Sequence, residues 1–261
     1  MKTARPKGVK VVQAVEKALR ILEALGNRAA PLTLSEICEA INFNMSTTYR
    51  LLQTLIGRGF VHYDEFSGKY RLGIKTFRIG NAALYAIDFR AEARPLMQEL
   101  VNLCKETANL VILDGSEVVY IEQVESSSMV RMLARLGSRL PAYSTGGGKA
   151  ILAYLEEEEL NEYLVRQPLV PHTVNTITSP TELKKALARI RQDGYAVDRE
   201  EMEYGVKCVA APIRNYTGKV IAALSVSGPG ARMTDEYLEA RLAPLVKQFA
   251  DRISGRLGYR G

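Results

Sequence analysis

The stretch Ser-Thr-Gly-Gly-Gly-Lys-Ala at residues 144–150 contains residue types that hold phosphates in other proteins. A nucleotide-binding P-loop requires Gly-x-x-x-x-Gly-Lys-Ser/Thr, in which the last hydroxyl binds magnesium. When Gly148 and Lys149 are aligned to this pattern, Tyr143 takes the place of the first glycine and Ala150 that of the hydroxyl. Both required groups are missing, so the sequence excludes a P-loop.

The glycines still favour a simpler chemistry. At the start of a helix, glycines let a ligand approach the backbone, and the first amides of a helix lack partners within it. A carboxylate would suit such a place. The alternative is that the glycines allow tight packing of a helix against a sheet, and the residues alone favour neither.

Two further residues raise the possibility of an enzyme. Cys208 could act as a nucleophile with His172 as its base, because the other histidine, His62, lies in a predicted hairpin. No nucleophile elbow or acidic partner accompanies them, and a single cysteine in an apolar strand is more often a small buried residue. The two histidines and three scattered cysteines have no metal-ligand spacing. The sequence therefore predicts no catalysis, cofactor or metal.

The charge is divided unevenly along the 261 residues. Residues 1–80 contain 13 Lys and Arg against 6 Asp and Glu, whereas the remainder contains 22 against 23. A basic domain joined to a near-neutral one is typical of a nucleic-acid-binding protein. No apolar run approaches the ~18 residues of a membrane helix, and the cysteines suggest no disulfide framework. We expect a cytoplasmic protein without a membrane partner.

The first eighty residues predict a helix-turn-helix. Apolar residues at positions 15, 18, 19, 22 and 25 form one helical face. Thr33 and Glu36 form a capping box for a short second helix, and Asn42 to Asn44 form the turn. A third helix then buries positions 51, 52, 55 and 56 and ends at Gly57 or Gly59. A short helix, a turn and a longer helix are typical of DNA readers.

Two short strands, residues 60–63 and 69–72, follow as a hairpin and complete a winged helix. Basic residues of the amino-terminal arm, Arg5, Lys7 and Lys10, would meet the DNA backbone or minor groove. A three-helix domain used only for protein contacts is the alternative, which the local charge disfavours. The third helix and the hairpin offer these candidate DNA contacts: Ser46, Thr47, Thr48, Tyr49, Arg50, Gln53, Lys69 and Arg71.

Beyond the hairpin, two consecutive helices are expected between Ile74 and Thr107, and their apolar faces could pair two subunits. A mixed α/β domain follows, with an antiparallel sheet. Strands are expected over 108–115, 117–124, 129–136, 195–198, 207–214 and 219–228, and helices over 146–155, 156–166, 179–193 and 234–257.

Taken together, these pieces resemble the IclR family of bacterial transcriptional regulators, from Val12 to Gly258. The matching segments are "MSTTYRLLQTL", "LPAYSTGGGKAILA" and "GYAVDREEMEYGVKCVAAPI" followed by "GKVIAALSVSGP". Within the family, "LARLGSRLPAYST", "NTITSP" and "RLGY" are most similar to regulators of sugar-acid catabolism, such as those that sense 2-keto-3-deoxygluconate. The resemblance implies homodimers, often paired into tetramers, that bind double-stranded operator DNA and a small organic acid.

The resemblance also implies an effector pocket in the second domain. Ser225 and Ser227 would offer hydroxyls to the acid, and Asp198 would face a ligand hydroxyl or a bridging water. The glycine run departs from many relatives, so the size of the ligand does not carry over. The implied pocket residues are Gly146, Gly147, Asp198, Cys208, Ser225 and Ser227, with an apolar wall of Met129, Met132 and Leu140.

We therefore predict an α+β protein in three parts. These are a winged helix-turn-helix at residues 1–73, a helical linker at 74–107 and an effector domain with a GAF-like or profilin-like sheet at 108–261. The predicted function is ligand-responsive transcriptional regulation, with repression as the expected direction. The rivals are a small-molecule enzyme that depends on Cys208 and His172 and a structural chromosome-binding protein without ligand dependence.

Overall fold

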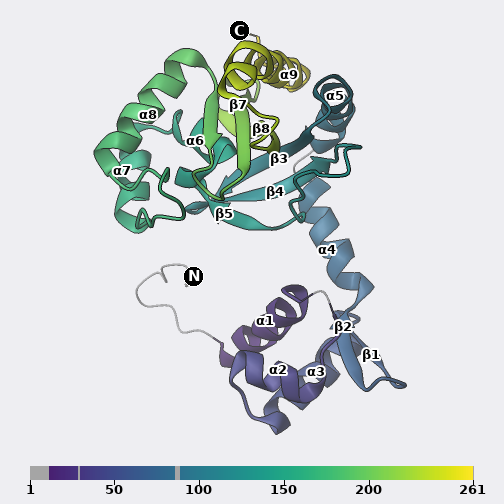
Figure 1. The fold of residues 1–261 in the computed structure, drawn as a ribbon. Helices are drawn as coiled ribbons and strands as arrows, with labels where there is room; N and C mark the ends of the chain where they lie inside the picture. The colour runs from purple at the N-terminus through teal and green to yellow at the C-terminus, as the bar shows by residue number, and fades with distance from the viewer. Residues whose placement is uncertain (1–11, 29, 86–88, 261) are drawn as a thin grey trace. The chain divides into compact units, whose positions relative to one another are not determined.

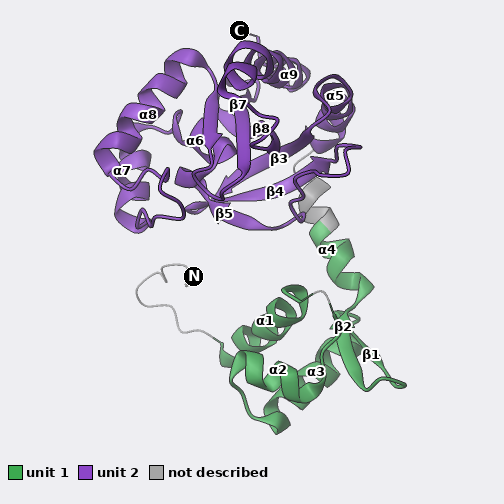
Figure 2. Cartoon of the chain, viewed as in Figure 1, with its two compact units in different colours: residues 1–87 green, residues 88–261 purple. Residues whose placement is uncertain are grey.

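The computed structural model describes residues 12–28, 30–85 and 89–260. The chain divides into two compact units, Met1–Ile87 (unit 1) and Asp88–Gly261 (unit 2) (Figure 2). The predicted linker of residues 74–107 is therefore shared between the units: α4 (Ile74–Tyr85) falls in unit 1, and α5 (Phe89–Cys104) falls in unit 2.

Unit 1 begins with three helices around a small apolar core. They are α1 (Gln13–Gly26), α2 (Leu34–Ile41) and α3 (Met45–Gly57) (Figure 1). The predicted inner face of α1 was partly wrong, because Val15 and Leu19 are exposed while Ile21 and Leu25 are buried. The helix is turned so that the side at positions 18, 21, 22 and 25 packs on α2 and α3.

The caps predicted around α2 are present. The Thr33 hydroxyl accepts a hydrogen bond from the amide of Glu36, and the Glu36 carboxylate accepts one from the amide of Thr33 at 2.7 Å. Asn42 ends α2 in the left-handed conformation, with φ 54°. Asn44 then caps α3 by accepting from the amide of Thr47 at 2.8 Å. These three side chains define the turn between the two helices.

The hairpin consists of β1 (Val61–Asp64) and β2 (Lys69–Leu72), which pair antiparallel. Its inner residues Val61 and Tyr70 join the core of unit 1. Leu32, in the segment before α2, forms a further bridge with Tyr70. The hairpin is therefore attached to the helices and completes the winged helix.

Unit 2 is built on a six-stranded antiparallel sheet with the order β5-β4-β3-β8-β7-β6. Helices α5 and α9 pack on one face of the sheet, and α6 packs on the other with α8 outside it (Figure 1). The strands are β3 (Thr107–Asp114), β4 (Glu117–Val124), β5 (Arg139–Pro141), β6 (Ala196–Arg199), β7 (Val206–Arg214) and β8 (Val220–Pro229).

The helices of unit 2 follow the predicted order. A 3₁₀ turn at Ala142–Ser144 precedes the first of them, and a π-helical turn at Tyr237–Leu242 leads into the last. They are α6 (Gly146–Leu152), α7 (Glu157–Arg166), α8 (Pro180–Asp193) and α9 (Ala243–Arg256).

The strand predicted at residues 129–136 is wrong. The edge strand that pairs with β4 is β5. The chain reaches β5 through Gly137, whose amide donates to the Tyr120 carbonyl at 2.7 Å. Residues 129–136 have no regular secondary structure. Met132, Leu133 and Ala134 instead line a cavity, so their apolar character reflects that wall rather than a place in the sheet.

Candidate functional site

The outer face of α3 is exposed because Leu52 and Leu55 on its other face are buried in the core of unit 1. Five predicted contact residues are available there. Thr47 is half-buried next to its cap, and the exposed ones are Ser46, Tyr49, Arg50 and Gln53.

Thr48 does not belong with them. Its side chain is 0% exposed, and its hydroxyl donates to the Asn44 carbonyl at 3.0 Å. Residue 48 lies four positions before Leu52 and therefore shares the inward face of the helix. The prediction that Thr48 contacts DNA is wrong.

The two predicted basic residues of the hairpin lie on β2. Arg71 is exposed and Lys69 is half-buried. The loop between the strands is held by Asp64, which accepts from the Ser67 hydroxyl at 2.7 Å and the Phe66 amide at 3.0 Å. These hydrogen bonds lower the pKa of the Asp64 carboxyl. The predicted arm residues Arg5, Lys7 and Lys10 lie outside the described residues.

Unit 2 contains a cavity of about 210 Å³ between the sheet and the start of α6. Asp198 on β6 pairs with Cys208 on β7, and Cys208 pairs with Ser227 on β8, so the three form a row across the strands. The structure brings together eight of the nine predicted pocket residues: Met132, Leu140, Gly146, Gly147, Asp198, Cys208, Ser225 and Ser227.

The ninth, Met129, does not line the cavity. Its side chain is 98% exposed. The predicted strand placed Met129 and Met132 in one regular element, but the segment is irregular and only residues 132–134 turn inward.

Sequence reasoning missed ten of the eighteen lining residues, among them Tyr120, Thr145, Met202 and Glu203. Two of these four carried a signal. Thr145 precedes the helix that begins at the glycines, so its role as N-cap was readable. Tyr120 shares the face of Val118 in a predicted strand. Met202 and Glu203 come from the irregular segment between β6 and β7, for which no periodicity applies.

The three glycines divide between the two interpretations left open by the sequence. A Cβ on Gly148 would lie 2.1 Å from the Ala142 carbonyl oxygen, so this position serves close packing of backbone on backbone. A Cβ on Gly147 would lie 2.6 Å from Val111 Cγ2. Gly146 faces Cys208 and Asp198, and both Gly146 and Gly147 line the cavity. Glycine is therefore required at residue 148 for close packing, and at residues 146 and 147 it also leaves the backbone open to the cavity.

The first residues of α6 bring backbone amides to the cavity wall. Thr145 caps the helix by accepting from the Gly148 amide at 3.1 Å. The Lys149 amide donates to the Thr145 carbonyl at 3.0 Å. Within the described part of the chain, the amides of Gly146 and Gly147 have no hydrogen-bond partner.

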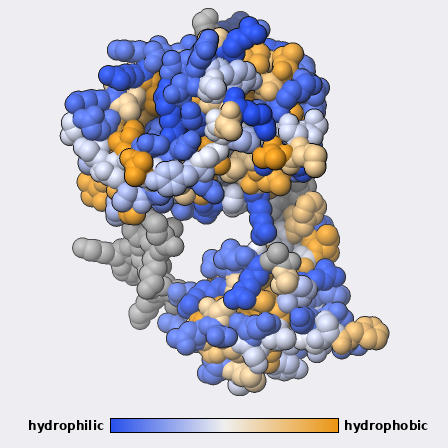
Figure 3. Space-filling view, in the orientation of Figure 1, coloured by the Kyte–Doolittle hydropathy of each residue, from blue (hydrophilic) through white to orange (hydrophobic). Residues whose placement is uncertain are grey.

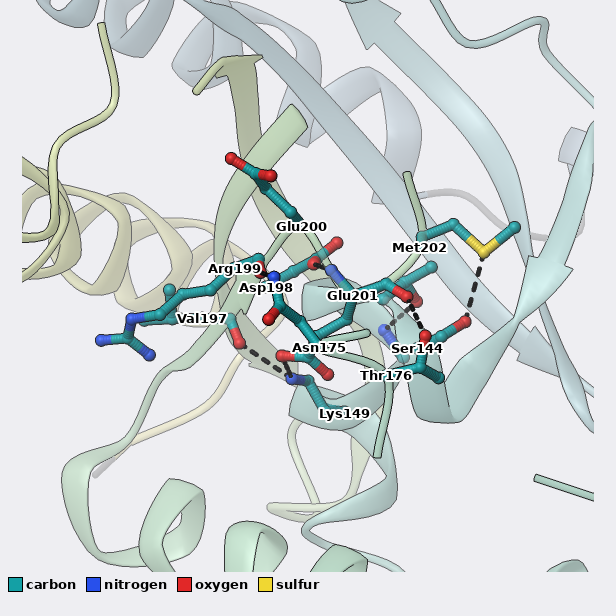
Figure 4. A network of polar contacts seen from close by, with 12 residues as sticks. Ser144, Lys149, Asn175, Thr176, Val197, Asp198, Arg199, Glu200, Glu201 and Met202 are labelled. Atoms are coloured by element: carbon teal, nitrogen blue, oxygen red, sulfur yellow. Dashed lines mark hydrogen bonds and ion pairs between the residues drawn. The ribbon is translucent and has the colours of Figure 1, made fainter. Parts of the chain in front are cut away.

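Lys149 is buried and does not offer its ammonium group to a ligand as a P-loop lysine does. Its side chain is 3% exposed, forms an ion pair with Glu201 and donates to the Val197 carbonyl at 2.9 Å (Figure 4). The Glu201 amide in turn donates to the Asp198 carboxylate at 2.7 Å. Lys149 thus fixes the segment after β6, which forms part of the cavity wall.

The acidic group of the cavity is unusual. Burial raises the pKa of Asp198 from 3.8 to about 7, against the lowering effect of Lys149, and the neighbouring Glu201 raises it further. Near neutral pH a large share of Asp198 is therefore protonated. A protonated carboxyl can donate a hydrogen bond, which an ionised one cannot.

Two family models match this chain, and together they cover both units. The model described as the IclR helix-turn-helix domain matches residues 14–65. The model described as the bacterial transcriptional regulator IclR C-terminal domain matches residues 81–255. The chain belongs to the IclR family.

Relatives in this family extend along nearly the whole chain. The HTH-type transcriptional repressor AllR of Salmonella typhi is 39% identical over 98% of this chain and 94% of its own length. The Thermotoga maritima IclR structure has a TM-score of 0.80 at 37% identity and covers 95% of this chain and 100% of its own. An IclR homolog from Microbacterium hydrocarbonoxydans, solved with 4-hydroxybenzoate, has a TM-score of 0.84 at 26% identity, over 94% and 99%.

Membership of the IclR family identifies a DNA-binding transcriptional regulator rather than an enzyme. The geometry around Cys208 agrees with this, because burial raises the pKa of its thiol to about 12 and disfavours the thiolate that a nucleophile needs. His172 lies instead against Tyr143, with Nε2 3.1 Å from the phenol oxygen.

Residues 12–28, 30–85 and 89–260 contain no group of three or more His, Cys, Asp or Glu placed to hold a metal ion. None of the described helices is both long and apolar enough to cross a membrane.

Proposed function

We propose that this protein is a cytoplasmic repressor whose affinity for operator DNA changes when a small organic acid occupies the cavity of unit 2. The observation that carries the proposal is the combination, in one chain, of an exposed polar reading helix and a lined, mostly enclosed cavity. The AllR relatives, which are named repressors, support the direction of control.

For DNA, we assign base reading to α3 and backbone contacts to the hairpin. Arg50 can bind guanine through two hydrogen bonds and Gln53 can bind adenine. Lys69 and Arg71 contribute positive charge toward phosphates. Ser46, Thr47 and Tyr49 complete the face and can bond to phosphate or base edges.

For the ligand, the donors of the cavity are neutral. No lysine or arginine is among the described residues that line it. A carboxylate would be held by the amides of Gly146 and Gly147 and by the hydroxyls of Ser225 and Ser227. Protonated Asp198 adds a donor for the same carboxylate or for a ligand hydroxyl, the second of which is the partner that the sequence predicts for it. Leu140 and Met132 supply an apolar wall.

We further propose a homodimer, with pairs of dimers forming a tetramer. Apolar side chains are exposed on α1 at Val15 and Leu19 and on α4 at Ile74 and Phe77. Apolar patches interrupt the hydrophilic surface of both units in Figure 3. A dimer would present two reading helices to successive major grooves about 34 Å apart. The acid would then shift the balance between two arrangements by 1–3 kcal/mol of coupling.

The test is a fluorescence-anisotropy titration of labelled DNA from upstream of the protein's own gene against scrambled DNA. It is repeated with pyruvate, 2-keto-3-deoxygluconate and 4-hydroxybenzoate. We expect a preference for the upstream DNA that one acid weakens. Equal affinity for both DNAs under every condition would contradict a sequence-specific repressor, and turnover of an acid would favour the enzyme alternative.

A further inference from the structure

Strand β4 switches faces of the sheet beside the cavity. Tyr120 pairs with Val111 of β3, and Glu122 pairs with the adjacent Leu110, so Ile121 is an extra residue between them. Such a β-bulge redirects the side chains that flank it. Residues two apart in a regular strand share a face. Here Tyr120 lines the cavity, whereas Glu122 reaches the helix on the opposite face, α5.

Glu122 is held tightly in this position. Its side chain is 7% exposed and accepts from Arg90 at 2.9 Å and from Arg94 at 2.6 Å. The two arginines lie one helical turn apart at the beginning of α5, so one carboxylate ties the first turn of this helix to β4. Separating a buried carboxylate from its partners leaves an uncompensated charge, so these ion pairs resist separation of Glu122 from the two arginines.

The junction between this turn and the rest of α5 lacks one backbone hydrogen bond. Pro95 follows directly after Arg94 and has no amide to donate to the Ala91 carbonyl. The first turn is thereby weakly joined to the rest of the helix. Moreover, α5 is the first element of unit 2, so the covalent connection from unit 1 enters unit 2 there.

We propose that Glu122 is a positioning residue that transmits occupancy of the cavity to the first turn of α5 and hence to the DNA-reading unit. A ligand that presses on Tyr120 or Val111 displaces the bulge, and Glu122 carries Arg90 and Arg94 with it. The proposal rests on the proposed effector role of the cavity, because it describes how that role is passed on.

The experiment needs no knowledge of the ligand. In Gly147→Ala the new Cβ lies 2.6 Å from Val111 Cγ2 and pushes the residue that pairs with Tyr120, as an occupant would. Hydrogen exchange of the peptide at residues 89–97 is measured by mass spectrometry in the full chain. The variants are Gly147→Ala, Glu122→Gln and the two combined.

We expect Gly147→Ala alone to change exchange in this peptide by about threefold or more, and to change it hardly at all when Glu122→Gln is present. If Gly147→Ala does not fold, Val111→Ala provides a second perturbation. It shortens the Val111 side chain, which lies next to Gly147 in the cavity wall. The matched control is Glu99→Gln, which breaks the 2.7 Å ion pair of α5 with Arg252 but is not connected to the bulge. In that background the response to the cavity variants should persist.

An equal response in the native and Glu122→Gln backgrounds, or no response of α5 to either cavity variant, would overturn the proposal. Loss of the response in Glu99→Gln as well would mean that Glu122 only stabilises the helix. These outcomes do not depend on DNA or acid. Failure of the anisotropy titration would therefore count against the proposed function and leave the exchange result to decide the link.

Discussion

In unit 1 the candidate contact residues of α3 project into solvent, whereas in unit 2 Asp198, Cys208 and Ser227 lie in a row beneath the surface. Arg50 can therefore be changed without leaving a hole or an unpaired group behind. Asp198 is 5% exposed, and any change there alters packing, protonation and ligand contacts together. In unit 1 a polar side chain can therefore contribute to binding without contributing to folding. In unit 2 the same side chain contributes to both.

The largest expected effect of this contrast is on folding. Gly148→Ala places a methyl group 2.1 Å from the Ala142 carbonyl oxygen, where only backbone could yield. We expect unit 2 to lose more than about 4 kcal/mol of stability, as is usual for severe overpacking against backbone. Chemical denaturation followed by circular dichroism would measure this loss. Unit 1, followed by hydrogen exchange of the peptides of α1 to α3 at each denaturant concentration, should keep its own transition, and joint unfolding would contradict the independence of the two units.

The second effect is the pH dependence of unit 2. The folded pKa of Asp198 is raised to about 7 from 3.8, so its stabilising contribution is complete below about pH 4 and is lost as the pH rises through 7. The loss amounts to as much as about 4 kcal/mol, at 1.36 kcal/mol for each pKa unit.

Asp198→Asn should remove this dependence, because an amide cannot ionise. Thermal melts from pH 4.5 to pH 8.5 would show a sloping midpoint in the native chain and a flatter one in the variant. Identical slopes would show that Asp198 is ionised in the folded protein. Ser225→Ala provides a control that changes the same cavity without changing a charge.

A smaller effect separates the two sites functionally. Arg50→Ala should weaken binding to the upstream DNA by about 10- to 100-fold, the value of one two-point contact to a base, while the acid binds as before. Anisotropy would measure the first quantity and calorimetry the second. Arg189→Ala, on the exposed side of α8, removes the same charge from unit 2 and should leave DNA affinity unchanged. A similar loss in both variants would indicate that only net charge matters.

The smallest effect concerns the turn of the reader. Thr33→Ala removes the hydroxyl that accepts from the Glu36 amide, and we expect unit 1 to lose about 1 kcal/mol. A urea titration of unit 1 would measure it. Ser35→Ala, at an exposed position in the first turn of α2 and not its cap, should cost less. An equal cost would show that the capping box adds nothing.

The sequence was sufficient for most of this fold where a local rule applies. Thr33 with Glu36, Asn42, and Gly68 in the hairpin loop with φ 67° each specify a conformation through their own neighbours, and the winged helix follows from them. The family resemblance supplied the row of Asp198, Cys208 and Ser227, which no periodicity would have assembled from three separate strands.

The errors have the opposite cause. Whether Thr48 turns inward depends on the rotation of α3 about its axis, and whether Met129 lines a wall depends on where an irregular segment crosses the sheet. Both are decided by packing between elements that are distant in sequence. The bulge at Ile121 belongs to the same class, because only pairing with β3 reveals the extra residue.

The burial of Lys149 has a practical consequence. Amine-reactive reagents modify a lysine only when its nitrogen is exposed and uncharged, and here the nitrogen is enclosed between Glu201 and the Val197 carbonyl. Acylation of Lys149 must therefore wait for unit 2 to open, while surface lysines such as Lys184 react at once. The rate at which this one position is acylated would measure how often unit 2 opens.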